Sequence, residues 1–435
     1  MNLVMKRLFE EKLYNWKIST SRKPLIVRGA RQVGKTYSIE AFGRDNFKNV
    51  IKIDFEQTPS LKKIFDGDFD VAKIIELIEI EKDANIILGD TLLFFDEIQL
   101  CQRALMSLRY FYENFPGLHL IVAGSLLEFE LNKISFPVGR VEFQFMYPLN
   151  FEEFLMATDN SRLIKYRPKL NSTSKQPDTI HNKFLKLSRE YFVVGGMPEA
   201  VKTYITKSMR SVSKVHSDLI TSFLQDIIKY EKGLDLDSLR VIFEKIPSLV
   251  GQEIKYTTIS KDLSIYKIKK ILEILRKALL IHPVVSSSAM GLPLMSGVSP
   301  TVFKYCFFDI GLMQHICGIS QMEILQQEDL LANYAGRLCE QYVGQELIAC
   351  GGSQNNHLFY WRRNKKNSNA EVDYLIVKDG WVYPIEIKNG PSGKLKSLHL
   401  FLEEHKKIKK GFVLNSGNIG AINNICFLPI YTKLD

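Results

Sequence analysis

Eight consecutive residues near the N-terminus have the types and spacing that hold a nucleoside triphosphate. The run Gly29-Ala30-Arg31-Gln32-Val33-Gly34-Lys35-Thr36 fits the phosphate-loop pattern G-x-x-x-x-G-K-[ST] at every fixed position. In such a loop backbone N–H groups wrap the phosphates, the lysine adds positive charge and the hydroxyl binds magnesium. We therefore expect ATP and Mg²⁺ as ligands, with Lys35 and Thr36 in these two roles.

A pair of acids follows the apolar run Thr91–Phe95. A buried strand that ends in carboxylates can hold Mg²⁺ through Asp96 and can place Glu97 to polarise the water that attacks the γ-phosphate. The other interpretation is that the two acids only cap the next helix. An apolar strand that runs into two acids is the arrangement that nucleotide hydrolysis requires, and it favours the first interpretation.

Two further residues are candidates for contact with the nucleotide. Ser125 follows the apolar run Leu118–Ala123 and can bond the attacking water or the γ-phosphate, although a simple turn serine has the same context. Arg140 is a candidate cation for the charge of the transition state, in cis or from a neighbouring subunit. The alternative for Arg140 is a solvated side chain. An arginine that acts in trans requires a homo-oligomer.

A second set of charged residues lies near the C-terminus, where Asp373 and the pair Glu386 and Lys388 follow in two apolar runs. Because side chains alternate along a strand, Glu386 and Lys388 share one face. Two carboxylates at that corner can hold Mg²⁺ or Mn²⁺, which activates water against a phosphodiester, and the lysine can stabilise the transition state. The alternative is an exposed hairpin whose acids pair with Arg362 and Arg363.

Together these segments resemble a known group, the prokaryotic AAA-type P-loop ATPases with a C-terminal restriction-endonuclease-like domain of the PD-(D/E)xK type and of unassigned function. The resemblance implies an additional-strand P-loop core with Glu97 as the catalytic base. It also implies that Glu340, a helix acid, helps Asp373 and Glu386 to hold metal. The matching segments are Arg28–Thr36, Phe95–Gln99, Ala123–Ser125, Gly139-Arg140, Gly195–Glu199, Leu338–Leu347, Tyr360–Arg362, Ala370–Ile376 and Tyr383–Lys388.

The resemblance leaves the function open, because related C-terminal domains often bind nucleic acid or partners without cutting. One alternative is an ATPase coupled to metal-dependent DNA cleavage. Another is a nucleotide-controlled switch, or a DNA- or protein-binding module, with an inactive nuclease-like domain. A protein-remodelling ATPase that does not bind DNA is the weakest of three alternatives.

The apolar runs predict the elements that position these residues. Short strands that alternate with helices in the first part of the chain predict an α/β fold, a P-loop NTPase core with a mainly parallel sheet covered on both faces. Residues 180–230 have helical patterning, interrupted by Gly195-Gly196-Met197-Pro198, and predict a helical lid. Strand patterns return at 358–362, 372–377, 382–387 and 411–414.

A basic segment, residues 253–285, resembles a winged helix-turn-helix. Ser264 begins its second helix, for which Ile265, Ile268, Ile271, Leu272 and Leu275 form the buried stripe. Lys267, Lys269 and Lys270 then face DNA phosphates and supply affinity with little base specificity. A helical packing module with solvated lysines is the alternative.

These patterns predict four domains: a P-loop ATPase core over 1–158, a helical lid over 159–235, a winged-helix-like domain over 236–298 and an α/β restriction-endonuclease-like domain over 299–435. The formal net charge of +10 favours an anionic partner, which we expect to be DNA. The six cysteines form no C-x-x-C pair, which predicts reduced thiols. No apolar run approaches the ~20 residues that span a bilayer, and residues 1–18 lack a secretory pattern, so we expect no membrane partner and a cytoplasmic location.

Overall fold

The computed structural model describes residues 5–131, 139–231, 233–319, 324–325, 335–351, 357–365, 368–388 and 395–434. The chain divides into two compact units, Val4–Tyr147 and Pro148–Asp435. Each unit has its own sheet and its own hydrophobic core. Among the described helices, none is both long and apolar enough to cross a bilayer.

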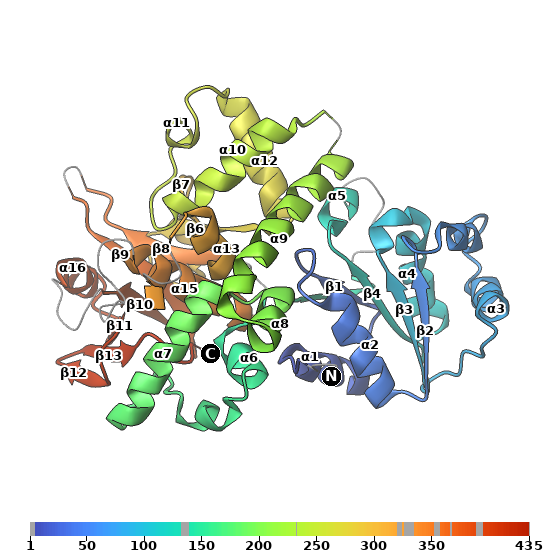
Figure 1. Cartoon of the computed structure of the whole chain (residues 1–435), viewed down its shortest axis with the longest axis horizontal. Helices are drawn as coiled ribbons and strands as arrows, with labels where there is room; N and C mark the ends of the chain where they lie inside the picture. The colour runs from blue at the N-terminus through green and yellow to red at the C-terminus, as the bar shows by residue number, and fades with distance from the viewer. Residues whose placement is uncertain are drawn as a thin grey trace. The chain divides into compact units, whose positions relative to one another are not determined.

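The N-terminal unit contains a five-stranded sheet in the order β2-β3-β4-β1-β5, and every neighbouring pair is parallel. This confirms the predicted α/β fold with a parallel sheet (Figure 1). Its helices and strands are α1 (Phe9–Ile18), β1 (Leu25–Arg28), α2 (Lys35–Asn46), β2 (Asn49–Asp54), α3 (Val71–Lys82), β3 (Thr91–Asp96), α4 (Gln102–Asn114), β4 (His119–Gly124), α5 (Leu127–Leu131) and β5 (Glu142–Phe145).

Both faces of this sheet are buried. Successive side chains of a strand point to opposite faces, and Ile51 and Leu93 belong to the core that includes residues of α3 and α4. The neighbouring residues Val50 and Leu92 instead lie against Gly43 of α2. Burial on both faces explains why β3 and β4 have continuous apolar sequences rather than alternating ones.

The C-terminal unit combines a helical part with an eight-stranded mixed sheet in the order β12-β13-β11-β10-β9-β8-β6-β7. Its elements are α6 (Phe151–Ala157), α7 (Asp178–Val194), α8 (Pro198–Thr206), α9 (Met209–Tyr230), α10 (Leu236–Lys245), α11 (Tyr256–Ile259), α12 (Ile265–Lys277), β6 (Ile281–Ser287), β7 (Val298–Phe307), α13 (Ile310–Ile316), α15 (Ala335–Cys350), β8 (Leu358–Arg362), β9 (Glu371–Lys378), β10 (Trp381–Ile387), α16 (Lys396–Glu404), β11 (Gly411–Asn415), β12 (Gly420–Ile422) and β13 (Ile425–Pro429).

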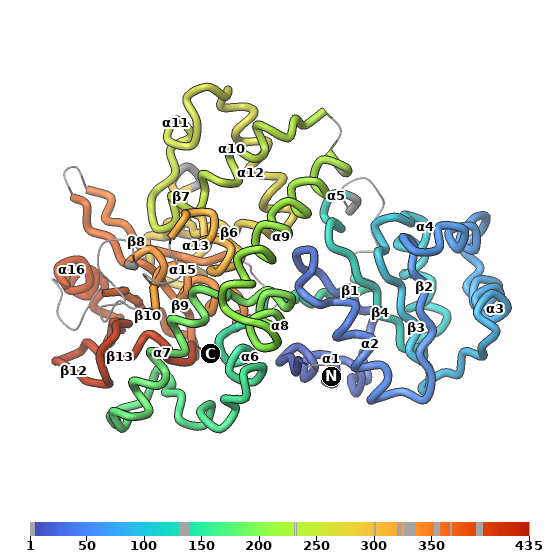
Figure 2. Tube along the Cα trace, in the orientation of Figure 1, coloured from blue at the N-terminus to red at the C-terminus, as the bar shows by residue number. Residues whose placement is uncertain are grey.

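The strands that follow the basic helix α12 belong to the same sheet as the C-terminal strands. β6 pairs with β7 on one side and with β8 on the other, so both strands between residues 281 and 307 are part of the large sheet. Their trace carries the labels β6 and β7 in Figure 2. The predicted boundary after residue 298 therefore coincides with the start of β7, inside a continuous sheet. One backbone hydrogen-bond network joins the two predicted domains.

The start of the C-terminal unit also differs from the predicted boundary at 158. Leu149 N donates to Gly196 O at 2.7 Å, and the Tyr191 hydroxyl donates to Leu149 O at 2.6 Å. The rings of Phe151 and Phe154 pack against Tyr191. These contacts place α6 with the helices that follow it, so the units separate at Tyr147–Pro148.

Helix α12 begins where it was expected, because the Ser264 hydroxyl caps Lys267 N at 3.3 Å. Ile268, Ile271, Leu272 and Leu275 are buried as predicted. Ile265 is not, since this first residue of the helix is 51% exposed. The buried stripe thus starts one turn later than the pattern indicated.

Candidate functional site

The phosphate loop joins β1 to α2, and its two fixed glycines have separate structural causes. Gly34 adopts a left-handed conformation with φ of 95°. At Gly29 an added Cβ would lie 2.2 Å from Met146 O. Glycine alone satisfies both demands without strain. Helix α2 starts at Lys35, so its unpaired N–H groups and the positive end of its dipole face the loop.

The structure brings together the three residues expected to bind the phosphates and Mg²⁺. The Thr36 hydroxyl, on α2, donates to Asp96 Oδ2, at the end of β3, at 2.8 Å. Lys35 is buried, and its Nζ donates to the carbonyl oxygens of Gly29 and Ala30 at 3.0 and 2.9 Å. Burial lowers the pKa of Lys35 to about 8, although Glu97 and Asp96 oppose that shift. A buried cation beside a hydroxyl–carboxylate pair is an arrangement suited to magnesium triphosphate.

Glu97 directly follows β3 and has a left-handed backbone with φ of 47°. Burial raises its pKa, while the Gln99 amide and the charge of Lys35 lower it. Gln99 Nε2 donates to Glu97 Oε2 at 2.5 Å. The expected general base is thus held by Gln99, a residue that the sequence pattern did not single out. No strand or helix periodicity relates the two residues, because Glu97 follows β3 with a left-handed backbone and Gln99 lies in a 3-10 turn, so the local sequence carried no signal.

Lys52 is a second residue that sequence reasoning missed. It lies on β2, and its Nζ is 3.1 Å from both Asp96 Oδ2 and Glu40 Oε1, and 3.3 Å from Asp54 Oδ2. Asp54 and Asp96 are partners in the β2–β3 register. An ammonium therefore shares the carboxylate that we expect to bind Mg²⁺. The alternation Lys52-Ile53-Asp54 at a strand end was its sequence signal.

Ser125 follows β4, which lies between the strand of Asp96 and the strand that leads into the phosphate loop. Its side chain is 5% exposed, and within the described residues its Oγ has no hydrogen-bond partner. Buried hydroxyls usually have a partner. The position and the unsatisfied hydroxyl both favour a ligand-facing serine over a turn serine.

Arg140 lies near the N-terminal ends of the parallel strands, whereas the phosphate loop lies at their C-terminal ends. It precedes β5, which runs parallel to β1 with Glu142 opposite Leu25, the first residue of β1. The loop follows the last residue of β1. Arg140 Nε contacts Glu113 Oε1 at 3.0 Å, near the C-terminal end of α4, and its side chain is 46% exposed. This location separates Arg140 from the phosphate loop of its own chain.

In the C-terminal unit, Asp373, Glu386 and Lys388 meet where β9 and β10 pair. Asp373 Oδ2 accepts a hydrogen bond from Ile387 N at 2.7 Å, and Lys388 Nζ donates to Glu386 Oε1 at 2.6 Å. Arg362 and Arg363 pair with other acids, Glu253 and Glu404, both at 2.8 Å. The predicted convergence therefore occurs, whereas the expected alternative with these arginines does not.

Glu340 reaches this corner through two residues that sequence reasoning missed. Lys304 Nζ lies 3.3 Å from Glu340 Oε1 and also forms an ion pair with Glu371. Glu371 shares a face of β9 with Asp373, two residues away, which was its sequence signal. Lys304 is an isolated cation in an apolar strand, 1% exposed. We call Glu340, Glu371, Asp373 and Glu386 the acid cluster.

Burial governs the protonation of the acid cluster. It raises the pKa of Glu340 to about 7, and burial together with the charge of Asp373 raises that of Glu386 to about 8. Burial alone would lower the pKa of Lys304, but the surrounding carboxylates hold it above its ordinary value. Lys304 therefore remains charged at neutral pH.

The acid cluster, as arranged, does not fit a divalent metal ion. Throughout the described part of the chain, no group of three or more His, Cys, Asp or Glu side chains is placed to hold one. Lys304 engages one oxygen each of Glu340 and Glu371, and Lys388 engages one oxygen of Glu386, so three carboxylates already have an ammonium partner. The expected Mg²⁺ or Mn²⁺ site at Glu340, Asp373 and Glu386 is therefore an ion-pair network in this structure.

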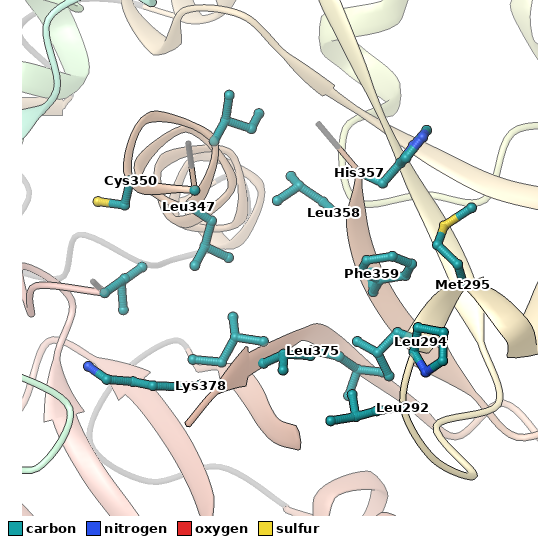
Figure 3. A pocket seen from close by; sticks show the side chains of 16 residues that line it. Leu292, Leu294, Met295, Leu347, Cys350, His357, Leu358, Phe359, Leu375 and Lys378 are labelled. Atoms are coloured by element: carbon teal, nitrogen blue, oxygen red, sulfur yellow. The ribbon is translucent and has the colours of Figure 1, made fainter. Parts of the chain in front are cut away.

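A cavity of about 780 Å³ lies elsewhere in the C-terminal unit, between the C-terminal end of α15, the β6–β7 connection and strands β8 and β9 (Figure 3). Its walls are mainly apolar and include Leu294, Met295, Leu347, Phe359 and Leu375. None of the predicted site residues lines it. The cavity and the acid cluster are therefore separate features.

Comparison with protein families identifies the first unit. A family described as an AAA domain matches residues 21–155, and two families described as domains of unknown function match residues 185–323 and 335–431. With the phosphate loop and the parallel sheet, the first match shows that the N-terminal part is an AAA-type P-loop domain. The restriction-endonuclease-like and winged-helix interpretations receive no support from these matches. No curated protein matches the chain.

Similar solved structures include the Aeropyrum pernix ORC1 protein in complex with DNA, at 12% identity over 71% of this chain and 90% of that chain, with a TM-score of 0.31. The Thermotoga maritima RuvB Holliday junction branch migration motor is 12% identical over 64% and 89%, with a TM-score of 0.31. AMPPCP-bound DnaA from Aquifex aeolicus is 13% identical over 63% and 88%, with a TM-score of 0.29. With TM-scores this low, the likeness carries no argument about function.

Proposed function

We propose that the protein binds and hydrolyses ATP, and that its nucleotide state controls a C-terminal unit that binds DNA without cutting it. The observation that carries the first part is the meeting of Lys35, Thr36 and Asp96, with Glu97 next in the chain. Lys35 supplies positive charge for the phosphates, Thr36 and Asp96 supply oxygens for Mg²⁺, and Glu97 supplies the general base.

In the proposed reaction a water molecule attacks the γ-phosphorus, the bond to the bridging oxygen breaks, and ADP and phosphate leave. Glu97 accepts the proton of the attacking water. Lys35 neutralises charge on the outer phosphates, and Ser125 positions the water or the γ-phosphate through its buried hydroxyl.

Magnesium fits the donor set at this site. In nucleotide sites Mg²⁺ binds through one or two protein side chains together with the substrate phosphates. The Thr36 hydroxyl and the Asp96 carboxylate, 2.8 Å apart, would supply those side chains, and Asp96 Oδ2 would exchange its contact with Lys52 Nζ for the ion. When bound, Mg²⁺ would neutralise charge that develops on the phosphate oxygens.

Arg140 is proposed to act on the nucleotide of a neighbouring subunit. An arginine at the end of the strands opposite its own phosphate loop is placed for a site in another copy of the chain. This role makes a homo-oligomer the active form, and the ion pair with Glu113 is the resting partner of the guanidinium.

The ATPase proposal is tested with purified full-length protein and a phosphate-release assay. We expect Glu97→Gln to retain binding of a fluorescent ATP analogue and to lose at least ~100-fold in kcat, since general-base removal typically costs that much. Lys35→Ala should lose both binding and turnover. Glu56→Gln, at an exposed acid after β2, is the matched control and should behave as the parent. Parent-like turnover in Lys35→Ala would exclude the site.

DNA binding is proposed for the exposed face of α12. Tyr266 is 80% exposed, and Lys269 and Lys270 are exposed beside it. Lys267 pairs with Asp235 at 2.5 Å, and Lys269 lies 5.1 Å from the Tyr256 ring. Lys270 and Tyr266 are therefore the best-placed contacts for a phosphate and an unstacked base.

The non-cutting interpretation of the C-terminal unit rests on the acid cluster. The order α15-β8-β9-β10-α16-β11 and the meeting of Asp373 with Glu386 support the resemblance to a restriction-endonuclease-like fold. The oxygens of this cluster are engaged by lysines, which disfavours metal-dependent catalysis. We expect no plasmid nicking with Mn²⁺ in any nucleotide state. Nicking that Asp373→Ala and Glu386→Ala both abolish would instead establish the nuclease alternative.

A further inference from the structure

The acid cluster contains a cation of its own, supplied by an edge strand. Lys304 lies on β7, the last strand of the eight-stranded sheet, opposite Val284 of β6. Its side chain is 1% exposed, so the ammonium lies inside the unit rather than in solvent. A buried ammonium is costly unless acids and hydrogen-bond acceptors surround it. The ion pairs with Glu340 and Glu371 therefore stabilise Lys304 in this buried position.

Three groups surround the ammonium of Lys304. Glu340 Oε1 lies 3.3 Å away, Glu371 forms the second ion pair, and the Tyr360 ring centroid is 4.9 Å away. The three come from a helix and two strands, α15, β9 and β8. The ammonium thus joins elements that are far apart in sequence, as a bound metal ion would.

Three further oxygens of the acid cluster are engaged by other groups of the unit. Glu340 Oε2 lies against Gly251, where an added Cβ would come within 2.4 Å of it. Lys388 takes Glu386 Oε1, and Ile387 N takes Asp373 Oδ2. Among the described residues, Glu386 Oε2 is the buried oxygen of this cluster without a hydrogen-bond partner.

A divalent ion and the Lys304 ammonium compete for the same carboxylate oxygens of Glu340 and Glu371. Mg²⁺ requires about six oxygens at about 2.1 Å in octahedral geometry, whereas an ammonium accepts longer contacts and fewer partners. The two positive charges would also repel each other where little water screens them. We propose that Lys304 is the resident cation of the acid cluster and that it excludes divalent metal ions from it.

This inference deepens the proposed non-cutting role of the C-terminal unit and is independent of ATP hydrolysis. It predicts a latent metal site. Removing the ammonium while keeping the side-chain length, as in Lys304→Met, leaves Glu340 and Glu371 without their ion-pair partner. Mn²⁺ should then enter the cluster.

The test is a Mn²⁺ titration, followed by calorimetry and by the paramagnetic resonance of free Mn²⁺, on nucleotide-free full-length protein. All variants carry Asp96→Asn, which removes the magnesium ligand of the ATP site. We expect no Mn²⁺ binding by the parent up to millimolar concentrations. Lys304→Met should bind one ion, with a dissociation constant at least ~10-fold below that limit. Lys304→Arg keeps the charge and should bind no Mn²⁺. Adding Glu340→Gln to Lys304→Met should abolish the gained binding.

Two outcomes would overturn the inference. One is a parent protein that binds Mn²⁺ and loses it with Asp373→Asn. The other is a folded Lys304→Met protein, judged by circular dichroism and gel filtration, that gains no binding. Should Lys304→Met fail to fold, the parent and Asp373→Asn titrations decide alone: absence of binding supports the inference, and binding that depends on Asp373 refutes it. ATP turnover of the protein without Asp96→Asn is measured separately, so failure of the ATPase proposal is seen independently.

Discussion

Asp309 and Gly196, 113 residues apart in the chain, are joined by a hydrogen bond from Gly196 N to Asp309 Oδ2 at 2.6 Å. The same carboxylate caps α13 by accepting from Leu312 N at 3.0 Å. Gly195 has φ of 72°, and at Gly196 an added Cβ would lie 2.1 Å from Leu149 O. The Gly-Gly-Met-Pro segment is therefore a packing junction of the C-terminal unit.

Asp309→Ala should destabilise the C-terminal unit by about 2–4 kcal/mol, because it removes a helix cap and leaves a buried N–H of Gly196 unpaired. Urea unfolding followed by circular dichroism measures this loss. Asp235→Ala is the matched control, since Asp235 caps α10 from an exposed position and should cost only about 1 kcal/mol. Equal losses in the two variants would show that the hydrogen bond to Gly196 adds no stability beyond that of a helix cap.

Gln99→Ala should change the pH dependence of ATP hydrolysis. Glu97 accepts a proton only when ionised, so turnover is present above its pKa and is lost as the pH falls through it. The Gln99 amide lowers that pKa, and its removal should move the acidic limb of the rate profile to higher pH. We also expect kcat to fall about 10-fold with little change in KM. Gln57→Ala, at an exposed position of the same unit, is the control, and an unmoved limb would contradict the role.

A mixture of two inactive proteins should recover ATPase activity if Arg140 acts in trans. Lys35→Ala disables the phosphate loop but keeps Arg140, and Arg140→Ala does the reverse. In a mixed oligomer, an intact loop can then meet an intact arginine from its neighbour. We expect each variant to lose about 10³-fold alone and the equimolar mixture to regain a measurable fraction. A mixture no more active than its components, in particles shown to exchange subunits, would refute action in trans.

Lys270→Ala should weaken DNA binding and reduce its dependence on salt. A lysine that contacts a phosphate releases a counterion, so its removal should lower the slope of log K against log salt by about 1. Fluorescence anisotropy with a duplex oligonucleotide at several salt concentrations measures the slope. Lys183→Ala, at an exposed lysine of α7, should leave the slope unchanged. The same loss in both variants would indicate diffuse electrostatics rather than a surface on α12.

His282 should make the C-terminal unit sensitive to acid. Burial lowers its pKa to about 4, from an ordinary value near 6.5. Because the unfolded chain binds the proton more readily, stability is full above pH 6.5 and falls as the pH drops toward 4. The loss attributable to this group is at most about 3 kcal/mol. Urea unfolding between pH 7 and pH 4 should show it, and His282→Gln should flatten the dependence; an unchanged slope would exclude His282 as its source.

Much of the N-terminal fold could be predicted because its strands are apolar runs and its glycine loop is a local pattern. Thr91–Phe95 and Leu118–Ala123 became β3 and β4 with almost the same bounds. The strand order was not readable in the same way, since adjacency in a parallel sheet depends on how helices cross over it. That order places β4 between β3 and β1, and so places Ser125 between the acid pair and the loop.

The amino-acid sequence by itself determined the nucleotide site, because Lys35, Thr36 and the Asp96–Glu97 pair belong to short segments whose spacing sets their chemistry. Tertiary structure alone decided the partners of the acid cluster. Lys304 lies 36 residues from Glu340 and 67 from Glu371, and no local pattern brings them together. Burial explains why these residues pair, since desolvated carboxylates require a nearby cation and the fold places a lysine beside them. The parallel pairing of β5 with β1 likewise decided that Arg140 lies at the end of the strands away from the phosphate loop.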